Sequence, residues 1–289
     1  MIKKILLFLI PLAYLSCAED RAKSFLNHLP KMEEISFYVP GKSSENSLIN
    51  YISHYTITEY NSLTGDVFIA IQLAEKSSPL DEEGDKIVWG PISWSGYLYR
   101  LWVEKKYGVY SFIIDMAFSD IPKPTFYVIA EGEADGEFSF TIDLKNLHNL
   151  DSAKYPDGET LFVQFHPDGV TGFAKTFSYL YPSKGDENAG YIDGTFYFLS
   201  LKKEEKKCVS FTRYWDYKKE IPYLLEKVYI EACWTIDGVG EGRAVFSEGE
   251  LEKEEEVLEC WDKEGNLIYK RTDGEEQGNE KECPFRGSF

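Results

Sequence analysis

Residues 97–118 read YLYRLWVEKKYGVYSFIIDMAF, and this stretch decides the expected fold class. Its two arms, Tyr97 to Val103 and Val109 to Phe118, are rich in aromatic and β-branched residues, which favour strands. Between them, Glu104 to Gly108 is a short polar segment with a glycine, as in a hairpin loop. In the second arm every other residue is apolar, which indicates one buried face. The stretch predicts an antiparallel β-hairpin.

The same two-residue period continues along the chain. Residues 138–144 alternate apolar and polar side chains, as a strand with one buried face does. Further strands are expected at residues 35–39, 66–73, 125–131, 160–165, 173–179 and 191–201, separated by turn-forming sequences. One short helix is expected within residues 47–55, where apolar residues recur at helical spacing. Many short strands of this kind predict a mainly β fold, an antiparallel sandwich or barrel.

The first twenty residues, MIKKILLFLIPLAYLSCAED, have the layout of an export signal. Two lysines precede an apolar run, Ile5 to Leu15, that is too short to span a bilayer comfortably. The triplet Leu15-Ser16-Cys17 resembles the end of bacterial lipoprotein signals, although Tyr14 stands where that family usually has leucine. The resemblance implies cleavage before Cys17, lipidation of that cysteine and anchoring in the bacterial cell envelope, with the membrane as a partner through the N-terminal lipid.

A second cleavage remains open. Ser16-Cys17-Ala18 also fits the small-x-small rule of an ordinary secretory peptidase, with cleavage before Glu19. The protein would then be soluble in the periplasm or secreted. In both alternatives the mature chain is exported to the far side of the cytoplasmic membrane.

The charge and the aromatic content limit the possible classes of protein. The chain has 289 residues and a formal net charge of −18, and removal of Lys3 and Lys4 with the leader makes it −20. Such a surface repels nucleic acid and anionic lipid headgroups, so neither is expected as a default partner. The 20 Tyr, 19 Phe and 6 Trp supply apolar area for a sizeable core.

Apart from Cys17, the cysteines lie in the last third of the chain, at Cys208, Cys233, Cys260 and Cys283. An even number in an exported chain predicts two disulfides, with three pairings open. No close cysteine pair suits zinc. The charged run at residues 202–207 is the candidate boundary before this part. We therefore expect a signal peptide (1–16), a tether or short helix (17–32), an antiparallel β domain (33–201) and a smaller disulfide-stapled β module (202–289).

The cysteine-containing part carries a faint repeat. Residues 233–238 and 260–265 both read C-W-x-x-x-G after an apolar stretch. Each copy predicts a strand that enters a hairpin. Because neighbouring side chains of a strand point to opposite faces, the tryptophan of each copy is expected to pack inward while its cysteine bridges to a neighbouring element.

No common catalytic motif is present, and the sequences G-x-S-x-G and H-E-x-x-H do not occur. The segment Gly41-Lys42-Ser43 lacks the first glycine and the preceding strand of a phosphate loop, so we expect a surface loop. The four histidines are scattered, at His28, His54, His148 and His166. We expect no cofactor other than a Ca²⁺ ion, for which an acidic loop offers oxygen ligands at Asp186, Asn188 and Asp193.

The segment Trp89 to Tyr97 reads WGPISWSGY, and its glycines and proline indicate a loop. On the rim of a β-sandwich, Trp89, Trp94 and Tyr97 could stack on sugar faces or hold an apolar ligand. The alternative is that both tryptophans fold back into the core.

These observations favour a non-catalytic envelope lipoprotein that binds an envelope protein or a glycan, or has a structural role. Two alternatives remain. An exported hydrolase, for example one that acts on glycans, would need two facing carboxylates about 5–10 Å apart across a cleft. A lipocalin-like carrier of an apolar ligand would need a closed barrel with an internal cavity.

Overall fold

The computed structural model describes residues 21–29, 31–32, 36–134, 138–155, 158–167, 171–180, 195–201, 206–215, 217–218 and 225–284. In the strand segments between residues 164 and 206 the description is of the backbone alone.

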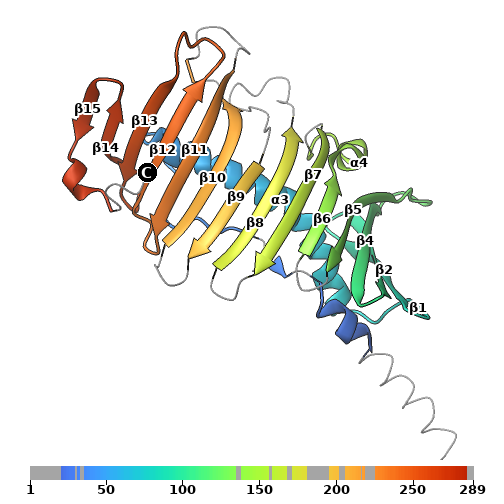
Figure 1. Cartoon of the computed structure of the whole chain (residues 1–289). Coiled ribbons are helices and arrows are strands. Elements are labelled where there is room, and N and C mark those ends of the chain that lie inside the picture. Colours follow the sequence, from blue (N-terminus) through green and yellow to red (C-terminus); the bar gives the residue numbers. More distant parts are fainter. Residues whose placement is uncertain are drawn as a thin grey trace, which may run out of the picture.

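In the described part of the chain, fifteen strands pair in chain order, each antiparallel to the next (Figure 1). They are β1 (Asp81–Glu83), β2 (Lys86–Trp94), β3 (Tyr97–Lys106), β4 (Val109–Phe118), β5 (Tyr127–Ala134), β6 (Phe138–Asp143), β7 (Gly158–Pro167), β8 (Thr171–Leu180), β9 (Thr195–Leu201), β10 (Lys206–Trp215), β11 (Glu226–Thr235), β12 (Gly240–Ser247), β13 (Glu255–Trp261), β14 (Leu267–Thr272) and β15 (Glu275–Gly278). Among the described residues, the labelled helices are α3 (Leu48–Glu75), α4 (Leu144–Leu150) and the 3₁₀ helix η2 (Glu280–Glu282), and residues 21–26 are also helical.

The expected class is confirmed: the fold is mainly β with antiparallel strands, and two disulfides lie in its C-terminal part. The sheet has two antiparallel sections. One consists of the seven strands β1–β7 and the other of the six strands β10–β15. The strands β8 and β9 connect them, because β8 pairs with β7 and with β9, and β9 pairs with β10. Leu201 of β9 pairs with Lys206 of β10, and Lys206 and Lys207 of the charged run at 202–207 belong to β10.

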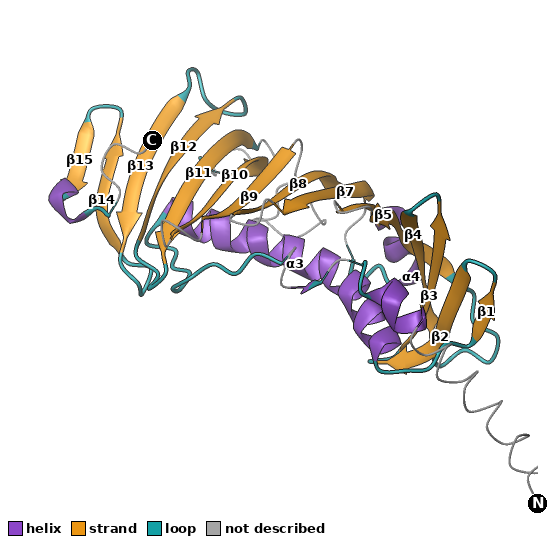
Figure 2. Ribbon diagram, turned by 60° about the horizontal axis from the view of Figure 1, so that its bottom comes forward, coloured by secondary structure: helices purple, strands orange, loops and turns teal. Residues whose placement is uncertain are grey.

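The helix α3 lies along the concave side of the arched sheet (Figure 2). Its buried residues recur every three or four positions, and they include Ile49, Ile52, Tyr60, Val67 and Ile71. It contacts β11, β12 and β13 of one section and β2 and β3 of the other. The core is therefore one cluster that follows the helix from one section to the other.

The predicted helix at 47–55 is confirmed but too short, and the predicted strand at 66–73 is wrong, because α3 continues to Glu75. The β-branched residues Val67, Ile69 and Ile71 favour strands in isolation. Here the helix is covered by sheet along its length, and burial of Val67, Phe68 and Ile71 outweighs that local preference.

The strand expected at 35–39 is also wrong where it is described, because residues 36–39 belong to neither a strand nor a helix. Asn61 of α3 takes the place of a partner strand. Its side-chain oxygen accepts from the Phe37 amide at 3.1 Å, and its nitrogen donates to the Phe37 carbonyl at 2.8 Å. Since these backbone groups are satisfied by a helix side chain, no strand pairing is needed.

The segment at 17–32 is described from residue 21, and residues 21–26 are helical, as the short-helix alternative predicted. Its apolar side chains are buried in the common core: Ala22, Phe25, Leu26 and Leu29. The body of the protein therefore includes this segment.

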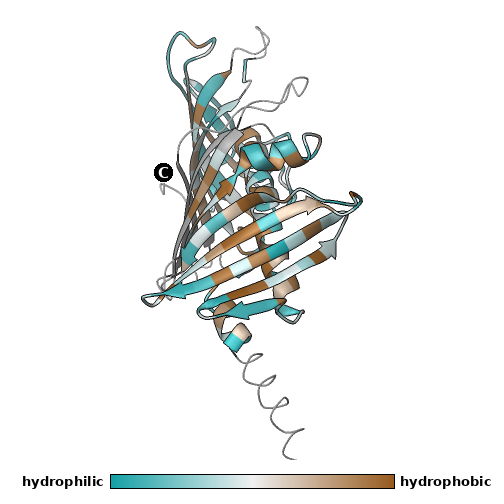
Figure 3. Cartoon of the chain, turned by 90° about the vertical axis from the view of Figure 1, so that its right-hand side faces the viewer, coloured by the Kyte–Doolittle hydropathy of each residue, from teal (hydrophilic) through white to brown (hydrophobic). Residues whose placement is uncertain are grey.

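The hairpin predicted at 97–118 is confirmed as β3 and β4, which pair Lys106 with Val109. Tyr107 and Gly108 form the turn, with φ of 52° and 90°. This left-handed backbone is accessible to glycine without strain, which explains Gly108 at the tip. Apolar and polar residues alternate along the N-terminal strands that face the viewer in Figure 3.

The segment Trp89 to Tyr97 is not a loop, which corrects that prediction. Residues up to Trp94 belong to β2, with a bulge between Trp89 and Ile92 where Gly90 and Pro91 leave the register. A bulge holds the residues that cannot join a regular ladder, so glycine and proline mark it as readily as they mark a loop.

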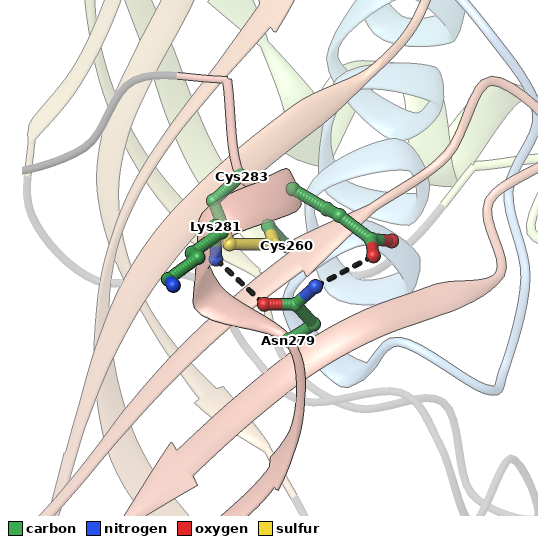
Figure 4. Close-up of a disulfide and its surroundings, with 5 residues drawn as sticks. Cys260, Asn279, Lys281 and Cys283 are labelled. Atoms are coloured by element: carbon green, nitrogen blue, oxygen red, sulfur yellow. Dashed lines mark hydrogen bonds between the residues drawn. A yellow bond between two sulfur atoms is a disulfide. The ribbon is translucent and has the colours of Figure 1, made fainter.

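The two C-W-x-x-x-G copies behave as the alternation predicted. Trp234 and Trp261 are fully buried, with ring centroids 5.7 Å apart. The disulfides join Cys208 to Cys233, directly opposite across β10 and β11, and Cys260 to Cys283. In Figure 4 the second disulfide fixes the segment of η2, where the Asn279 side chain accepts from the Lys281 amide at 3.1 Å.

The hairpin turns of both copies pack on the loop at 41–44. A Cβ atom at Gly238 would lie 2.5 Å from the Gly41 Cα, and one at Gly265 would lie 2.4 Å from the Lys42 carbonyl oxygen. Gly41-Lys42-Ser43 is exposed and irregular, so the predicted surface loop is confirmed.

Candidate ligand-binding site beside the central helix

A buried polar cluster around Asp66 lies in the C-terminal half of α3. Asp66 is 3% exposed, and its carboxylate accepts from the Tyr99 hydroxyl at 2.9 Å and the Tyr155 hydroxyl at 2.6 Å. The Lys154 ammonium lies 3.3 Å from the same carboxylate. A buried carboxylate is stable only when its charge is compensated in this way, so the cluster is fully organised before any ligand arrives.

The helix α4 and the turn after it place Tyr155 and Lys154. Asp143 caps α4 by accepting from the Asn146 amide at 2.7 Å. His148 Nδ1 then hydrogen-bonds with the Tyr155 carbonyl oxygen at 2.9 Å and holds the turn against the helix. Asp151 accepts from the Tyr97 hydroxyl at 2.5 Å, which fastens the turn to β3.

Burial, followed by the charge of Asp66, raises the pKa of Tyr99 and of Tyr155 well above the usual range. Burial and then the Asp151 hydrogen bond raise the pKa of Tyr97. The hydrogen bond from Tyr97 in turn lowers the pKa of Asp151. These phenols therefore stay protonated and donate, while the Asp151 carboxylate stays charged and accepts.

A pocket of about 370 Å³ opens between α3 and this turn. Its lining consists of Tyr55, Thr58, Glu59, Ser62 and Leu63 from the helix and residues 152–155 from the turn. Hydroxyl groups, two phenol rings and one pair of opposite charges therefore face the same space. Concave sites with a few convergent polar groups are where proteins bind small molecules.

Each charged wall of the pocket has a buried counter-charge behind it. Arg213 of β10 is fully buried and donates to the Thr56 hydroxyl at 2.7 Å and to the Glu59 carboxylate at 3.4 Å. Its guanidinium also lies 5.0 Å from the centre of the Tyr55 ring. On the facing wall Lys154 is paired with Asp66. The charged groups of the pocket are thus electrically balanced, although the whole chain is strongly acidic.

The sequence-predicted contact residues are separated by the structure. Trp89 is fully buried in the core, Trp94 is 53% exposed near the turn between β2 and β3, and Tyr97 is 8% exposed within the Asp66 cluster. Tyr97 lies next to the candidate site, with its ring 4.9 Å from the Lys154 ammonium, but none of these three residues lines the pocket. A ligand contact at Trp94 stays a prediction.

The other candidates lie apart from the pocket or outside the described residues. The Ca²⁺ candidates Asp186, Asn188 and Asp193 and the lipidation candidate Cys17 fall outside the described residues. Within the described part of the chain, no group of three or more His, Cys, Asp or Glu side chains is placed to hold a metal ion.

The four histidines lie in different parts of the molecule and contact different residues. His28 stacks on Tyr110 with centroids 4.0 Å apart, and His148 holds the turn of the site. Burial lowers the pKa of His54 to about 4, and its ring lies edge-on to Trp234. The backbone of His166 belongs to β7.

Sequence reasoning missed Asp66, Glu59, Lys154 and Arg213. Asp66 and Lys154 are 88 residues apart, and Arg213 and Thr56 are 157 apart, so no local spacing could join them. A weak signal was present: the apolar positions 49, 52, 60, 63, 67 and 71 keep helical spacing well beyond residue 55. On such a helix, Asp66 would have been a charged residue close to the buried face.

The chain matches no protein-family model, no curated protein and no solved structure. Among the described helices, none combines the length and the apolar character needed to cross a bilayer.

Proposed function

We propose that the protein is an exported bacterial envelope protein, anchored by a lipid on Cys17, that binds a small glycan rather than catalysing a reaction. The observation that carries the binding role is the balanced pocket beside α3, with Tyr55, Glu59 and Lys154 in its lining. Aromatic rings beside carboxylate and hydroxyl groups match sugars, which have apolar faces and hydroxyl edges. The two disulfides support export, since such bonds persist in oxidising compartments.

The binding role is tested by calorimetric titration of the mature protein with a panel of mono- and disaccharides that includes N-acetylglucosamine. Glu59→Gln and Tyr55→Ala are expected to weaken binding about tenfold, since each removes a hydrogen bond or a ring contact worth about 1–1.5 kcal/mol. Glu75→Gln, at the exposed C-terminal end of the same helix, is the matched control and should leave binding unchanged. Absence of binding to any sugar would contradict the proposal.

Trp94→Ala distinguishes sugar binding in the pocket from sugar binding at Trp94, the contact predicted from the sequence. If Trp94 holds the sugar, this substitution will weaken binding while Glu59→Gln will not. If the pocket holds the sugar, Glu59→Gln will weaken binding while Trp94→Ala will not.

The anchor is tested by the intact mass of the mature protein from membranes. A diacylglycerol adduct on a chain that begins at Cys17 is expected, and Cys17→Ala should remove it and release the protein. A chain that begins at Glu19 without lipid would show the soluble alternative.

Two alternative functions, a glycan hydrolase and a lipocalin-like carrier, each require a structural feature that can be compared with the described residues. The pocket is lined by a single carboxylate among the described residues, Glu59, whereas glycan hydrolysis needs two that face each other. The described strands form an open order from β1 to β15, whereas a lipocalin-like carrier needs a closed ring. Release of reducing sugar from a polysaccharide, lost in Glu59→Gln, would favour the hydrolase.

A further inference from the structure

The first described helical segment packs on the β1–β4 end of the molecule. The Phe25 ring meets Tyr110 of β4 edge-on, with centroids 5.3 Å apart, and His28 stacks on the same ring at 4.0 Å. Ala22 is 4% exposed. The chain is therefore fixed to the body from this residue onward.

Arg21 shows which corner of that end the chain approaches. Its guanidinium donates to the Gly84 carbonyl and lies 3.8 Å from the Asp85 carboxylate, in the turn between β1 and β2. The Lys105 amide donates to the Asp85 carbonyl at 2.9 Å, so the end of β3 lies beside the same turn. The start of the body and the turn between β3 and β4 are thus at one corner.

The distance from the lipid to this corner is limited by covalent geometry. Cys17 precedes Ala22 by five residues, which reach at most about 18 Å when fully extended. The helix α3 alone is about 42 Å long, with one end near β2 and β3 and the other near β11 to β13. A lipid on Cys17 therefore holds the β1–β4 end close to the membrane and cannot hold the far end there.

The turn between β3 and β4 carries side chains that suit a membrane surface. Tyr107 at its tip is completely exposed, and Lys105 and Lys106 precede it. Tyrosine favours the boundary between water and hydrocarbon, and lysine favours lipid phosphates. Two of the nearby acids are paired: Glu104 with Lys106 at 2.9 Å, and Asp85 with Arg21. Glu83 of β1 is also exposed at this corner, so the contact rests on Tyr107 and the two lysines and not on a positive net charge of the corner.

We propose that the turn at residues 106–108, with Tyr107 at its tip, rests in the headgroup layer of the membrane that Cys17 anchors, so that α3 points away from the surface. The inference rests on the proposed lipid anchor. It adds that the anchor orients the protein, because the folded body begins within five residues of the lipid.

The test uses the lipidated full chain in vesicles of phosphatidylcholine and phosphatidylglycerol that contain a lipid with a nitroxide on its headgroup. A fluorescent amino acid replaces Tyr107 in one sample and Ile236 in another. Ile236 is 74% exposed beyond the end of β11, in the C-terminal section. The nitroxide is expected to quench the fluorophore at position 107 severalfold more than the one at position 236.

The outcomes separate this inference from the proposed function. A mature chain without lipid overturns both. A lipidated chain with equal quenching at the two positions, or stronger quenching at position 236, overturns the orientation and leaves the anchor intact. Lys105→Glu with Lys106→Glu provides a second variant at exposed positions, and it should reduce the quenching at position 107 without removing the lipid.

Discussion

Asp66 is a carboxylate inside the molecule that depends on three donors from distant parts of the chain. We expect Asp66→Asn to lower the free energy of unfolding by about 2 kcal/mol, because the amide removes the charge that holds Lys154 and leaves one hydroxyl poorly paired. Urea unfolding measures the change.

Asp85→Asn is the matched control for this prediction. The Asp85 side chain is 77% exposed and its ion pair with Arg21 is long, at 3.8 Å, so its loss should change stability by less than about 0.5 kcal/mol. If the two substitutions changed the free energy of unfolding equally, the Asp66 cluster would contribute no more to stability than a surface ion pair.

His54 makes stability depend on pH in a defined window. Burial lowers its pKa in the folded state to about 4, against 6.5 for the free side chain. Between these values the unfolded chain binds the proton more readily, so stability should fall as the pH falls from about 6.5 to about 4. His54→Phe is expected to flatten the curve of melting temperature against pH in this window.

Acidic residues also titrate in that window, so the comparison with a second histidine is needed. His28→Gln changes an exposed histidine and should leave the slope of the wild-type curve unchanged. If His54→Phe keeps the wild-type slope, the buried imidazole is not its source.

At the scale of single elements, strands with a clear alternation were predictable, whereas the full length of the helix α3 was not. Residues 138–143 alternate over their full length, and β6 has these bounds. Such a strand is specified by its own sequence, because the period of two follows from the pleat. The helix α3 depends on partners on several strands, and its β-branched residues favour the wrong structure until those partners are present.

The same distinction explains which part of the site was predictable. Tyr97 was a candidate ligand contact from the sequence; its hydroxyl donates to Asp151 and it does not line the pocket, so a ligand contact there stays a prediction. The pocket itself is made where α3 approaches the turn at 152–155, and no pattern in either segment indicates that approach.

The N-terminus of α3 is capped by another element. Ser47 makes no side-chain cap, and instead Glu259 of β13 accepts from the Ile49 amide at 2.9 Å and from the Ser47 hydroxyl at 3.0 Å. The positive end of the helix dipole also favours this carboxylate. We expect Glu259→Ala to cost about 2 kcal/mol in thermal or urea unfolding.

Glu256→Ala, on the exposed face of the same strand, provides the comparison and should cost no more than about 0.5 kcal/mol. An equal loss in both variants would mean that the strand, and not the cap, is sensitive to substitution.

At the scale of the whole molecule, the sheet is built from local pairs while α3 makes the long-range connection. Each strand pairs with its neighbours in the chain, so each section could form by successive hairpins. The outermost strands, β1 and β15, carry the acidic sequences DEE and EEQG. Charged edges of this kind discourage further strands from adding to the sheet.

Because α3 belongs to the core of both sections, we expect them to unfold together. Ile49 is fully buried near the β12 end of α3, and Phe68 is 1% exposed in its C-terminal half. Ile49→Ala and Phe68→Ala should each cost about 2–5 kcal/mol, and each should shift one and the same calorimetric transition. Two transitions, each moved by a single variant, would instead support independent units divided near the charged run at 202–207, because the helix would then have failed to couple them.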